Sequence, residues 1–318
     1  MSGFDKLSLT NCNFSDTLSA SFLFLFVSFG KSLTNILIEL TEQLTAILKI
    51  IRPLNFLITF VSIIVAAIIC SPDKLPGLNV FLAALTASLV LASGNSINDI
   101  HDIEIDRINK PLRPLPSGKL SIKEAYRLYI LLVIVSIVLS FLVSEMALII
   151  VLISILLLFL YSKYLKQIPL VGNITIAFLT GLVFIFGGVI VVNPVAAIVP
   201  AVFAFLINLI REIIKDMEDV DGDSKAGVIT MPIKFGFQKS KYIILFISLT
   251  LILYSLYPFI TQLYKIEYFV VMIVFVNPLL VYCPKILFKD HSPKSLKKIS
   301  SRLKLSMVFG LIAIYLGV

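Results

Sequence analysis

Residues 81–106 read FLAALTASLVLASGNSINDIHDIEID, an apolar run that ends in a cluster of acidic side chains. Residues 81–97 carry no charge, and a helix needs about 20 such residues to cross a bilayer. The following nine residues, 98–106, hold four carboxylates. So much negative charge at the edge of a membrane is costly unless cations neutralise it. The stretch therefore predicts a membrane helix with a cation-binding site at its end.

The whole chain has the composition of an integral membrane protein. Of its 318 residues, 58% are hydrophobic and 14% are charged, whereas soluble domains contain about 25% charged residues. Long continuous apolar stretches favour helices over a β-barrel. We predict an all-α, multi-pass membrane bundle with about nine spans: 53–70, 78–97, 126–143, 146–161, 170–192, 195–213, 241–260, 268–283 and 303–318. Its three cysteines are too far apart to suggest a disulfide framework or a zinc site.

The net charge of +8 is distributed unevenly between the loops. Loops 98–127, 161–169, 211–241 and 284–304 hold most of the basic residues, whereas the loops on the other side hold only Lys74 and Lys265. The positive-inside rule places such basic loops in the cytoplasm. We therefore expect a cell-membrane protein, and nucleic acid is not expected as a partner.

Residues 1–50 differ from the rest and are predicted to be an N-terminal extension to a membrane domain at 51–318. The run at 18–28 is too short to span a bilayer, and the start of the chain lacks the cationic residues of a signal peptide. Between 32 and 51, apolar residues recur at helical spacing. This pattern favours an amphipathic helix at the membrane interface.

A second acidic cluster, KDMEDVDGD at 215–223, follows the sixth predicted span. Two sets of aspartates share the spacing i, i+3, i+7: Asp99, Asp102 and Asp106 in the first, and Asp216, Asp219 and Asp223 in the second. On a continuous helix this spacing places all three on one face. Mg²⁺ prefers such oxygen ligands, and substrate phosphates often complete its coordination shell. We therefore predict a Mg²⁺ site whose ligands come from both acidic clusters and which binds a diphosphate.

Basic and amide side chains near the two clusters are candidates for binding phosphate oxygens. Six of them flank the clusters: Arg107, Lys110, Arg113, Asn208, Arg211 and Lys215. A third candidate set, Tyr161, Lys163 and Lys166, lies between the fourth and fifth spans, where an interfacial anchor is the alternative for Lys163. Arg52 and Asn55 begin the first span, and a polar Asn there is expected to face a cavity. His101 is expected to point away from the aspartates.

The two clusters resemble a known family. NDIHDIEID matches the NDxxDxxxD motif of the UbiA-type intramembrane prenyltransferases, and KDMEDVDGD resembles their second aspartate motif. The resemblance covers roughly residues 50–318. It implies a central cavity in which Mg²⁺ holds a prenyl diphosphate donor, whose C1 gains carbocation character and is attacked by an acceptor. It also implies metal ligation by both motifs, with Asn98 included. Tyr161 resembles the family's tyrosine near the reacting carbon, and Asn55 resembles its first-helix asparagine. With Lys166, a candidate diphosphate or acceptor contact, they are the expected catalytic residues.

The stretch DRINKPLRPLPSGKLS at 106–121 indicates which branches of the family the chain is most similar to. Its short spacing from Asp106 to Arg113 is similar to that of two branches, the archaeal-type ether-lipid enzymes and the chlorophyll synthases. The second motif is closer to the ether-lipid branch. This implies transfer of a geranylgeranyl group from its diphosphate to the free hydroxyl of geranylgeranylglyceryl phosphate. Chlorophyll-type or aromatic-acceptor transfer is the alternative within the family.

A secondary transporter is the more distant alternative. Transporters usually place substrate and ion ligands near the bilayer midplane, whereas these acids lie at helix ends. The sequence does not indicate an oligomeric state.

Overall fold

The computed structural model describes residues 34, 37–38, 40–73, 75–225 and 227–318. By its internal packing the chain divides into two units, Met1–Ile47 and Leu48–Val318. Residues 40–51, part of the predicted amphipathic segment, are helical, and its interfacial position stays a prediction. The short apolar run at 18–28 lies outside the described residues.

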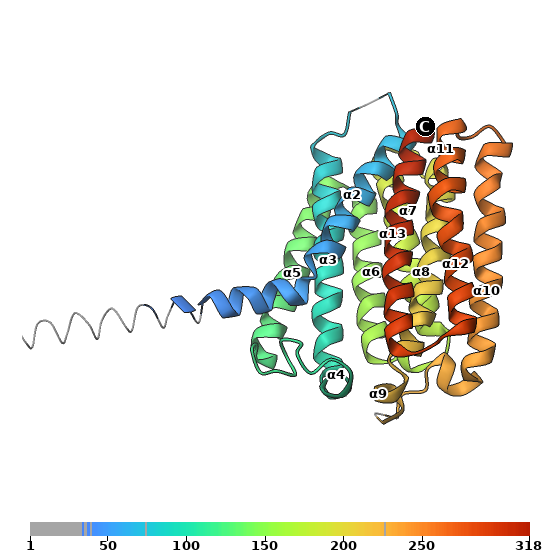
Figure 1. Cartoon of the computed structure of the whole chain (residues 1–318). Coiled ribbons are helices and arrows are strands. Elements are labelled where there is room, and N and C mark those ends of the chain that lie inside the picture. Colours follow the sequence, from blue (N-terminus) through green and yellow to red (C-terminus); the bar gives the residue numbers. More distant parts are fainter. Residues whose placement is uncertain (1–33, 35–36, 39, 74, 226) are drawn as a thin grey trace, which may run out of the picture. The chain divides into compact units, whose positions relative to one another are not determined.

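The unit Leu48–Val318 is a bundle of membrane-length helices (Figure 1). The described part of the chain contains nine helical segments long and apolar enough to span a bilayer, which confirms the predicted fold class. They are α2 (Pro53–Cys70), α3 (Leu78–His101), α5 (Ile122–Val143), α6 (Glu145–Lys163), α7 (Val171–Ile190), α8 (Ile198–Glu218) with the preceding turn η2 (Val195–Ala197), α10 (Met231–Ile260), the composite of α11 (Ile266–Val271), π-helical η3 (Met272–Val276) and α12 (Asn277–Lys289), and α13 (Pro293–Gly317). Three short helices connect them: α4 (Ile103–Asn109), η1 (Leu165–Gln167) and α9 (Val220–Lys225).

Several helices begin at recognisable capping residues. Ser121 and Glu124 form a reciprocal capping box at the start of α5, and the Ser144 hydroxyl accepts from a first-turn amide of α6. Ser292 caps α13, whose first residue is Pro293. This helix therefore begins ten residues before the predicted start at 303. The prediction missed the polar first turns, because it followed only the apolar run.

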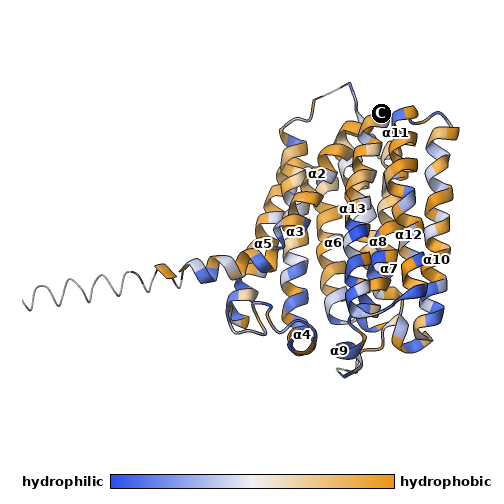
Figure 2. Cartoon of the chain, in the orientation of Figure 1, coloured by the Kyte–Doolittle hydropathy of each residue, from blue (hydrophilic) through white to orange (hydrophobic). Residues whose placement is uncertain are grey.

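The two helices that lead into the acidic motifs are the central ones. In α3 and in the η2–α8 segment, 67% of the residues in an apolar 18-residue stretch are buried inside the protein, compared with 17% in α5 and α6. Figure 2 shows the apolar helices of the bundle, with hydrophilic residues gathered on α4 and α9 and at the same end of the bundle. The acidic motifs therefore lie where the central helices end.

Close packing through glycines sets α7 against its neighbours. A Cβ added at Gly181 would lie 2.8 Å from the Ala201 carbonyl oxygen of α8, and one at Gly187 would lie 2.6 Å from the Ala66 Cβ of α2. Such distances are far below van der Waals contact, so only glycine allows these approaches. Helices α2, α7 and α8 are thereby drawn together around the interior.

The prediction that each aspartate set lies on one continuous helical face is wrong. Helix α3 ends at His101 and α4 begins at Ile103, so the chain bends at Asp102. Helix α8 ends at Glu218 and the chain bends in the same way at Asp219. The two residues have nearly identical backbone angles, φ −92° and ψ 5° at Asp102 and φ −95° and ψ 6° at Asp219. Aspartate disfavours a helix interior because its side chain competes for backbone hydrogen bonds.

Candidate functional site

The two acidic motifs meet at one end of the bundle, where α4 and α9 lie (Figure 1). The Lys110 Nζ lies 2.5 Å from a carboxylate oxygen of Asp219. The Asn109 amide donates to the backbone carbonyl of Asp219 at 3.2 Å. Residues that follow the first motif thus bind the middle aspartate of the second. This juxtaposition joins the two halves predicted from the sequence into one site.

Gly222 allows this contact, and its replacement is a first test of it. A Cβ at Gly222 would lie 2.2 Å from the Asn109 side-chain nitrogen. We expect Gly222→Ala to displace the Asn109 amide, break its bond to Asp219, and destabilise the protein by about 1 kcal/mol. Thermal unfolding in detergent measures the effect. In an Asn109→Ala background the same substitution should cost almost nothing; an equal loss in both backgrounds would contradict the contact.

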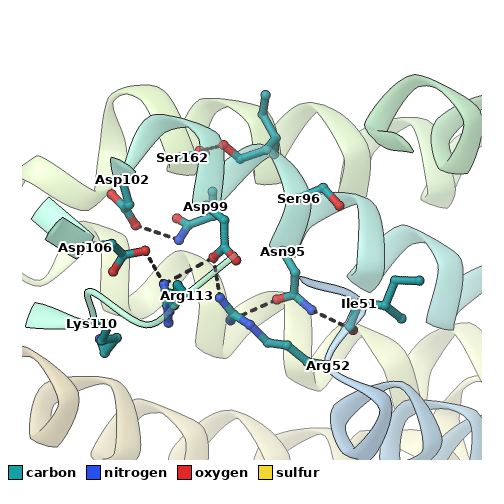
Figure 3. A network of polar contacts seen from close by, with 12 residues as sticks. Ile51, Arg52, Asn95, Ser96, Asp99, Asp102, Asp106, Lys110, Arg113 and Ser162 are labelled. Carbon is teal, nitrogen blue, oxygen red and sulfur yellow. Dashed lines mark hydrogen bonds and ion pairs between the residues drawn. The ribbon is translucent and has the colours of Figure 1, made fainter. Parts of the chain in front are cut away.

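Arginines neutralise the buried carboxylates of the first motif (Figure 3). The Arg113 guanidinium donates to Asp106 at 2.5 Å and to Asp99 at 3.2 Å. Arg52 donates to Asp99 at 2.6 Å and to the Asn95 side-chain oxygen at 3.1 Å. Arg52 has φ 58°, a left-handed conformation that is rare outside glycine. These bonds hold it there, as is common for strained residues at functional sites.

Asp102 lies between an amide and a lysine. It accepts a hydrogen bond from the Asn98 side-chain nitrogen at 2.7 Å and forms an ion pair with Lys166 of η1. The side-chain oxygen of Asn98 is buried and has no partner within the described residues. Buried polar atoms almost always have a partner. This orphaned oxygen is therefore available to a ligand that the protein alone does not supply.

One carboxyl in each motif is buried and therefore less readily ionised than a free carboxyl. Asp216 accepts from the Asn173 amide at 2.8 Å. Burial raises the pKa of Asp223 to about 7, and the negative charges of Asp219 and Asp102 act on it in the same direction. Burial also raises the pKa of Asp106, although Arg113 opposes this shift. A bound cation would favour the charged form of both groups.

The donor set fits Mg²⁺. It consists of carboxylate and amide oxygens without cysteine, the chemistry that Mg²⁺ prefers. No group of three Asp, Glu, His or Cys side chains in the described parts of the chain already surrounds one point. Mg²⁺ commonly takes one or two carboxylates and leaves its remaining positions to water and phosphate oxygens.

Tyr161 lies near residues of both acidic motifs. Its phenol is within electrostatic range of Glu212, Asp216, Asp102 and Arg52. Asn55, one turn after Arg52, is half-buried, and its side chain has no hydrogen-bond partner among the residues described.

Sequence reasoning missed Glu212. This buried side chain pairs with Lys215 at 2.5 Å and with Arg211 at 3.3 Å. The signal was its spacing, since Glu212 lies four residues before Asp216 on α8 and thus on the same helical face.

Two predicted phosphate contacts lie outside the site. Arg107 is exposed and pairs with the exposed Glu104 at 2.7 Å. Lys163 is exposed, with its Nζ 5.1 Å from the centre of the Tyr164 ring, which agrees with the alternative of an interfacial anchor. Both residues adjoin site residues in sequence, but their helical positions direct them elsewhere. His101 contacts the Ser162 hydroxyl through Nδ1 at 2.7 Å, away from the carboxylates as expected.

The fold is that of a multi-pass membrane protein, and the carboxylates gathered at one end of its apolar bundle have the chemistry to bind a cation and a polyanionic ligand. The sequence model of the UbiA prenyltransferase family matches residues 59–308. The chain belongs to this family, which confirms the resemblance of its two motifs. It is therefore an integral membrane prenyltransferase.

Relatives match the chain over almost their whole length. The digeranylgeranylglyceryl phosphate synthase of Methanocaldococcus jannaschii is 39% identical over 280 residues, which cover 87% of this chain and 97% of that protein. The protein of the same name from Methanosphaera stadtmanae is 35% identical over 270 residues, covering 85% and 98%. A solved structure of a digeranylgeranylglyceryl phosphate synthase has a TM-score of 0.70 at 38% identity, covering 87% and 98%. A UbiA homologue from Archaeoglobus fulgidus bound to DMAPP and Mg²⁺ shares the fold, with a TM-score of 0.58 at 20% identity, covering 84% and 98%.

Proposed function

We propose that the protein transfers a geranylgeranyl group from geranylgeranyl diphosphate to the free hydroxyl of geranylgeranylglyceryl phosphate, with Mg²⁺ as cofactor. The main support for this proposal is that the two aspartate motifs lie together: Lys110, which follows the first motif, pairs with Asp219 of the second. Support comes from relatives named for this reaction, which are 35% and 39% identical and align over 98% and 97% of their length. Residues 51–318 form the catalytic domain in this proposal, and residues 1–50 are an extension to it.

The oxygen donors of both motifs hold the ions in this proposal: Asn98, Asp99, Asp102, Asp106, Asp216, Asp219 and Asp223. Bound Mg²⁺ supplies neutralising charge for the leaving diphosphate. Lys110, Lys166 and Arg113, which pair with these carboxylates in the structure, are close enough to donate to phosphate oxygens that the ions leave free. Charge-assisted bonds of this kind are about twice as strong as neutral ones.

The transfer breaks the bond between C1 of the donor and its diphosphate oxygen. The acceptor hydroxyl oxygen forms the new bond to C1, its proton is released, and diphosphate leaves with the electron pair. The Tyr161 ring stabilises positive charge at C1, because an aromatic face attracts cations. The half-buried Asn55 orients the reacting groups from the first turn of α2, and the apolar walls exclude water from the reactive carbon.

An apolar cavity beside the motif is suited to the prenyl tail. It has a volume of about 130 Å³ and is lined by residues of α2, α3, α6 and α7, among them Leu91, Ser154 and Thr180. Leu91 lies one helical turn before Asn95, the residue that binds Arg52. A donor whose diphosphate lies at the motif can thus extend its tail along α3 into this cavity.

We expect Ser154→Phe to shorten the preferred donor. The added ring occupies the cavity, so geranyl diphosphate should be used about as well as before, while kcat/KM for geranylgeranyl diphosphate should fall about tenfold or more. Competition between the two donors measures the change. The matched control is Leu156→Phe on the exposed side of the same helix, which should keep the original preference. Unchanged donor preference in Ser154→Phe would remove this cavity from the tail path.

We propose that the site faces the cytoplasm. The loops at the end that holds α4 and α9 carry most of the basic residues, as the positive-inside rule requires of cytoplasmic loops. Labelling of single cysteines introduced at Ser117 and at Gln262 in sealed, oriented vesicles tests this orientation. Access to Ser117→Cys only from the outside would contradict it.

An acceptor panel tests the proposed reaction. Purified protein in detergent with Mg²⁺ should release diphosphate from geranylgeranyl diphosphate when geranylgeranylglyceryl phosphate is present, and 4-hydroxybenzoate should not replace it. Product from the aromatic acid alone would indicate the aromatic-acceptor branch. The absence of turnover with every prenyl donor and acceptor would refute the transferase assignment.

A further inference from the structure

A second group of cations lies deeper in the bundle, and we call it the inner basic cluster. It consists of Arg52 before α2, Arg211 and Lys215 on α8, and Lys304 on α13. The charge of Lys304 interacts with those of Arg211, Arg52 and Glu212. The charge of Lys215 interacts with those of Glu212, Arg211 and Arg52. Helices α8 and α13 and the residue before α2 therefore bring four cations near Glu212.

Glu212 does not neutralise this cluster. It pairs with Lys215 and Arg211, and Asp99 pairs with Arg52. Lys304 is half-buried and forms neither a hydrogen bond nor an ion pair with any described residue. Asp216 is also within electrostatic range of Lys215, so four cations face three carboxylates, and one positive charge is left over. Such an excess in a partly buried site is unfavourable unless an anion joins it.

The same region contains buried donors without acceptors. The Arg211 Nε and the Asn208 side-chain nitrogen are buried and have no partner in the described part of the chain. Asn208 is 5% exposed. It lies three residues before Arg211 and seven before Lys215, so all three share one face of α8. Unpaired buried donors cost free energy that a ligand with several acceptor oxygens can recover.

Apart from Arg52, which pairs with Asp99 of the first motif, this cluster is distinct from the cations assigned to the diphosphate. Lys110, Lys166 and Arg113 pair with aspartates of the two motifs. Arg211 and Lys215 pair instead with Glu212. Tyr161 lies within range of both Glu212 and the motif residues Asp102 and Asp216. Tyr161, which we place at the reacting carbon, thus lies within range of carboxylates paired with both groups of cations.

We propose that the inner basic cluster binds the phosphate monoester of the acceptor lipid, and that Lys304 is one of its contacts. This inference rests on the proposed function, because it requires an acceptor that carries a phosphate. A dianionic phosphate supplies the negative charge that the cluster lacks, and its oxygens accept from the free donors of Arg211 and Asn208. The cluster thereby selects a phosphorylated acceptor over a neutral alcohol or phenol.

Kinetics of Lys304 variants test this assignment. We expect Lys304→Gln to raise the KM for geranylgeranylglyceryl phosphate about tenfold or more, the effect of losing one bond to a charged group. The KM for geranylgeranyl diphosphate should stay unchanged, and Lys304→Arg should restore most of the acceptor affinity. Lys298→Gln, on the exposed side of the same helix, is the matched control and should behave like the original protein. Lys304→Met, which keeps the apolar stem, replaces the Gln variant if the latter unfolds.

A dephosphorylated acceptor separates phosphate recognition from a structural effect. Geranylgeranylglycerol should be a poor substrate of the original protein, and Lys304→Gln should use it no worse, so the preference for the phosphorylated acceptor shrinks. An equal loss with both acceptors, or a raised donor KM alone, would overturn the assignment. Failure of the original protein to use the phosphorylated acceptor would instead refute the proposed function.

Discussion

Replacing Asp102 or Asp219 with asparagine should lower turnover by about 10³-fold or more, while the protein stays folded in detergent. Each residue lies at the bend of its motif, and each carboxylate pairs with a lysine, Asp102 with Lys166 and Asp219 with Lys110. Removing the charge weakens metal binding and hence the stabilisation of the leaving diphosphate, which usually contributes most to catalysis in reactions of this kind. Initial rates of diphosphate release at several Mg²⁺ concentrations measure the loss.

Two neighbouring carboxylates are the matched controls. Asp221 is exposed two residues after Asp219, and Glu104 is exposed two residues after Asp102. Asp221→Asn and Glu104→Gln remove the same charge from the same segments but should leave turnover nearly unchanged. Near-normal activity in Asp102→Asn would exclude that residue from the metal site. Losses as large in the controls as in the motif variants would show that the overall charge, rather than the site, matters.

Arg113→Gln should destabilise the protein by about 3 kcal/mol or more, the cost of leaving a buried carboxylate without its cation. Arg113 binds both Asp106 and Asp99, which are 3% and 4% exposed. The charges of these aspartates raise the pKa of Arg113 despite the opposing effect of burial. Thermal unfolding in detergent without added Mg²⁺ measures the loss.

Mg²⁺ should partly restore this variant. If the two aspartates are metal ligands, a bound ion replaces the missing positive charge, so Mg²⁺ should raise the unfolding temperature of Arg113→Gln more than that of the original protein. Arg107→Gln, which breaks only an exposed pair with Glu104, should change stability by less than about 0.5 kcal/mol. A variant that is destabilised but indifferent to Mg²⁺ would argue for a purely structural ion pair.

The spans were predictable because lipid demands continuous apolar helices, and this requirement is visible residue by residue. Their polar ends were not. Helix α10 begins at Met231 rather than at 241, and α13 begins at Pro293 rather than at 303. The first turns of α13 carry lysines that continue the helix outside the apolar run, whereas α10 is interrupted at Gly236, whose φ of 83° is not helical. Hydropathy identifies the part of a helix that lies in the lipid. The ends of the helix depend on backbone hydrogen bonding, which can continue into polar residues.

The site was only partly predictable. The aspartates were found because two clusters repeat one spacing, but the bends at Asp102 and Asp219 depend on how the chain turns between packed helices. Proximity in sequence suggested Arg107 and Lys163, which the structure places elsewhere. Asn109 and Lys304 gain their roles from neighbours on other helices, and no local pattern marks them, whereas the spacing of Glu212 to Asp216 on α8 was a signal that was overlooked.

Isotope labelling of the acceptor tests the central claim most directly. Geranylgeranylglyceryl phosphate with ¹⁸O in its free hydroxyl is incubated with geranylgeranyl diphosphate, Mg²⁺ and purified protein, and both products are analysed by mass spectrometry. Attack of the hydroxyl on C1 predicts that the ¹⁸O lies in the new ether and that the released diphosphate is unlabelled. Label in a phosphate product, or a donor consumed without any ether formed, would contradict the account.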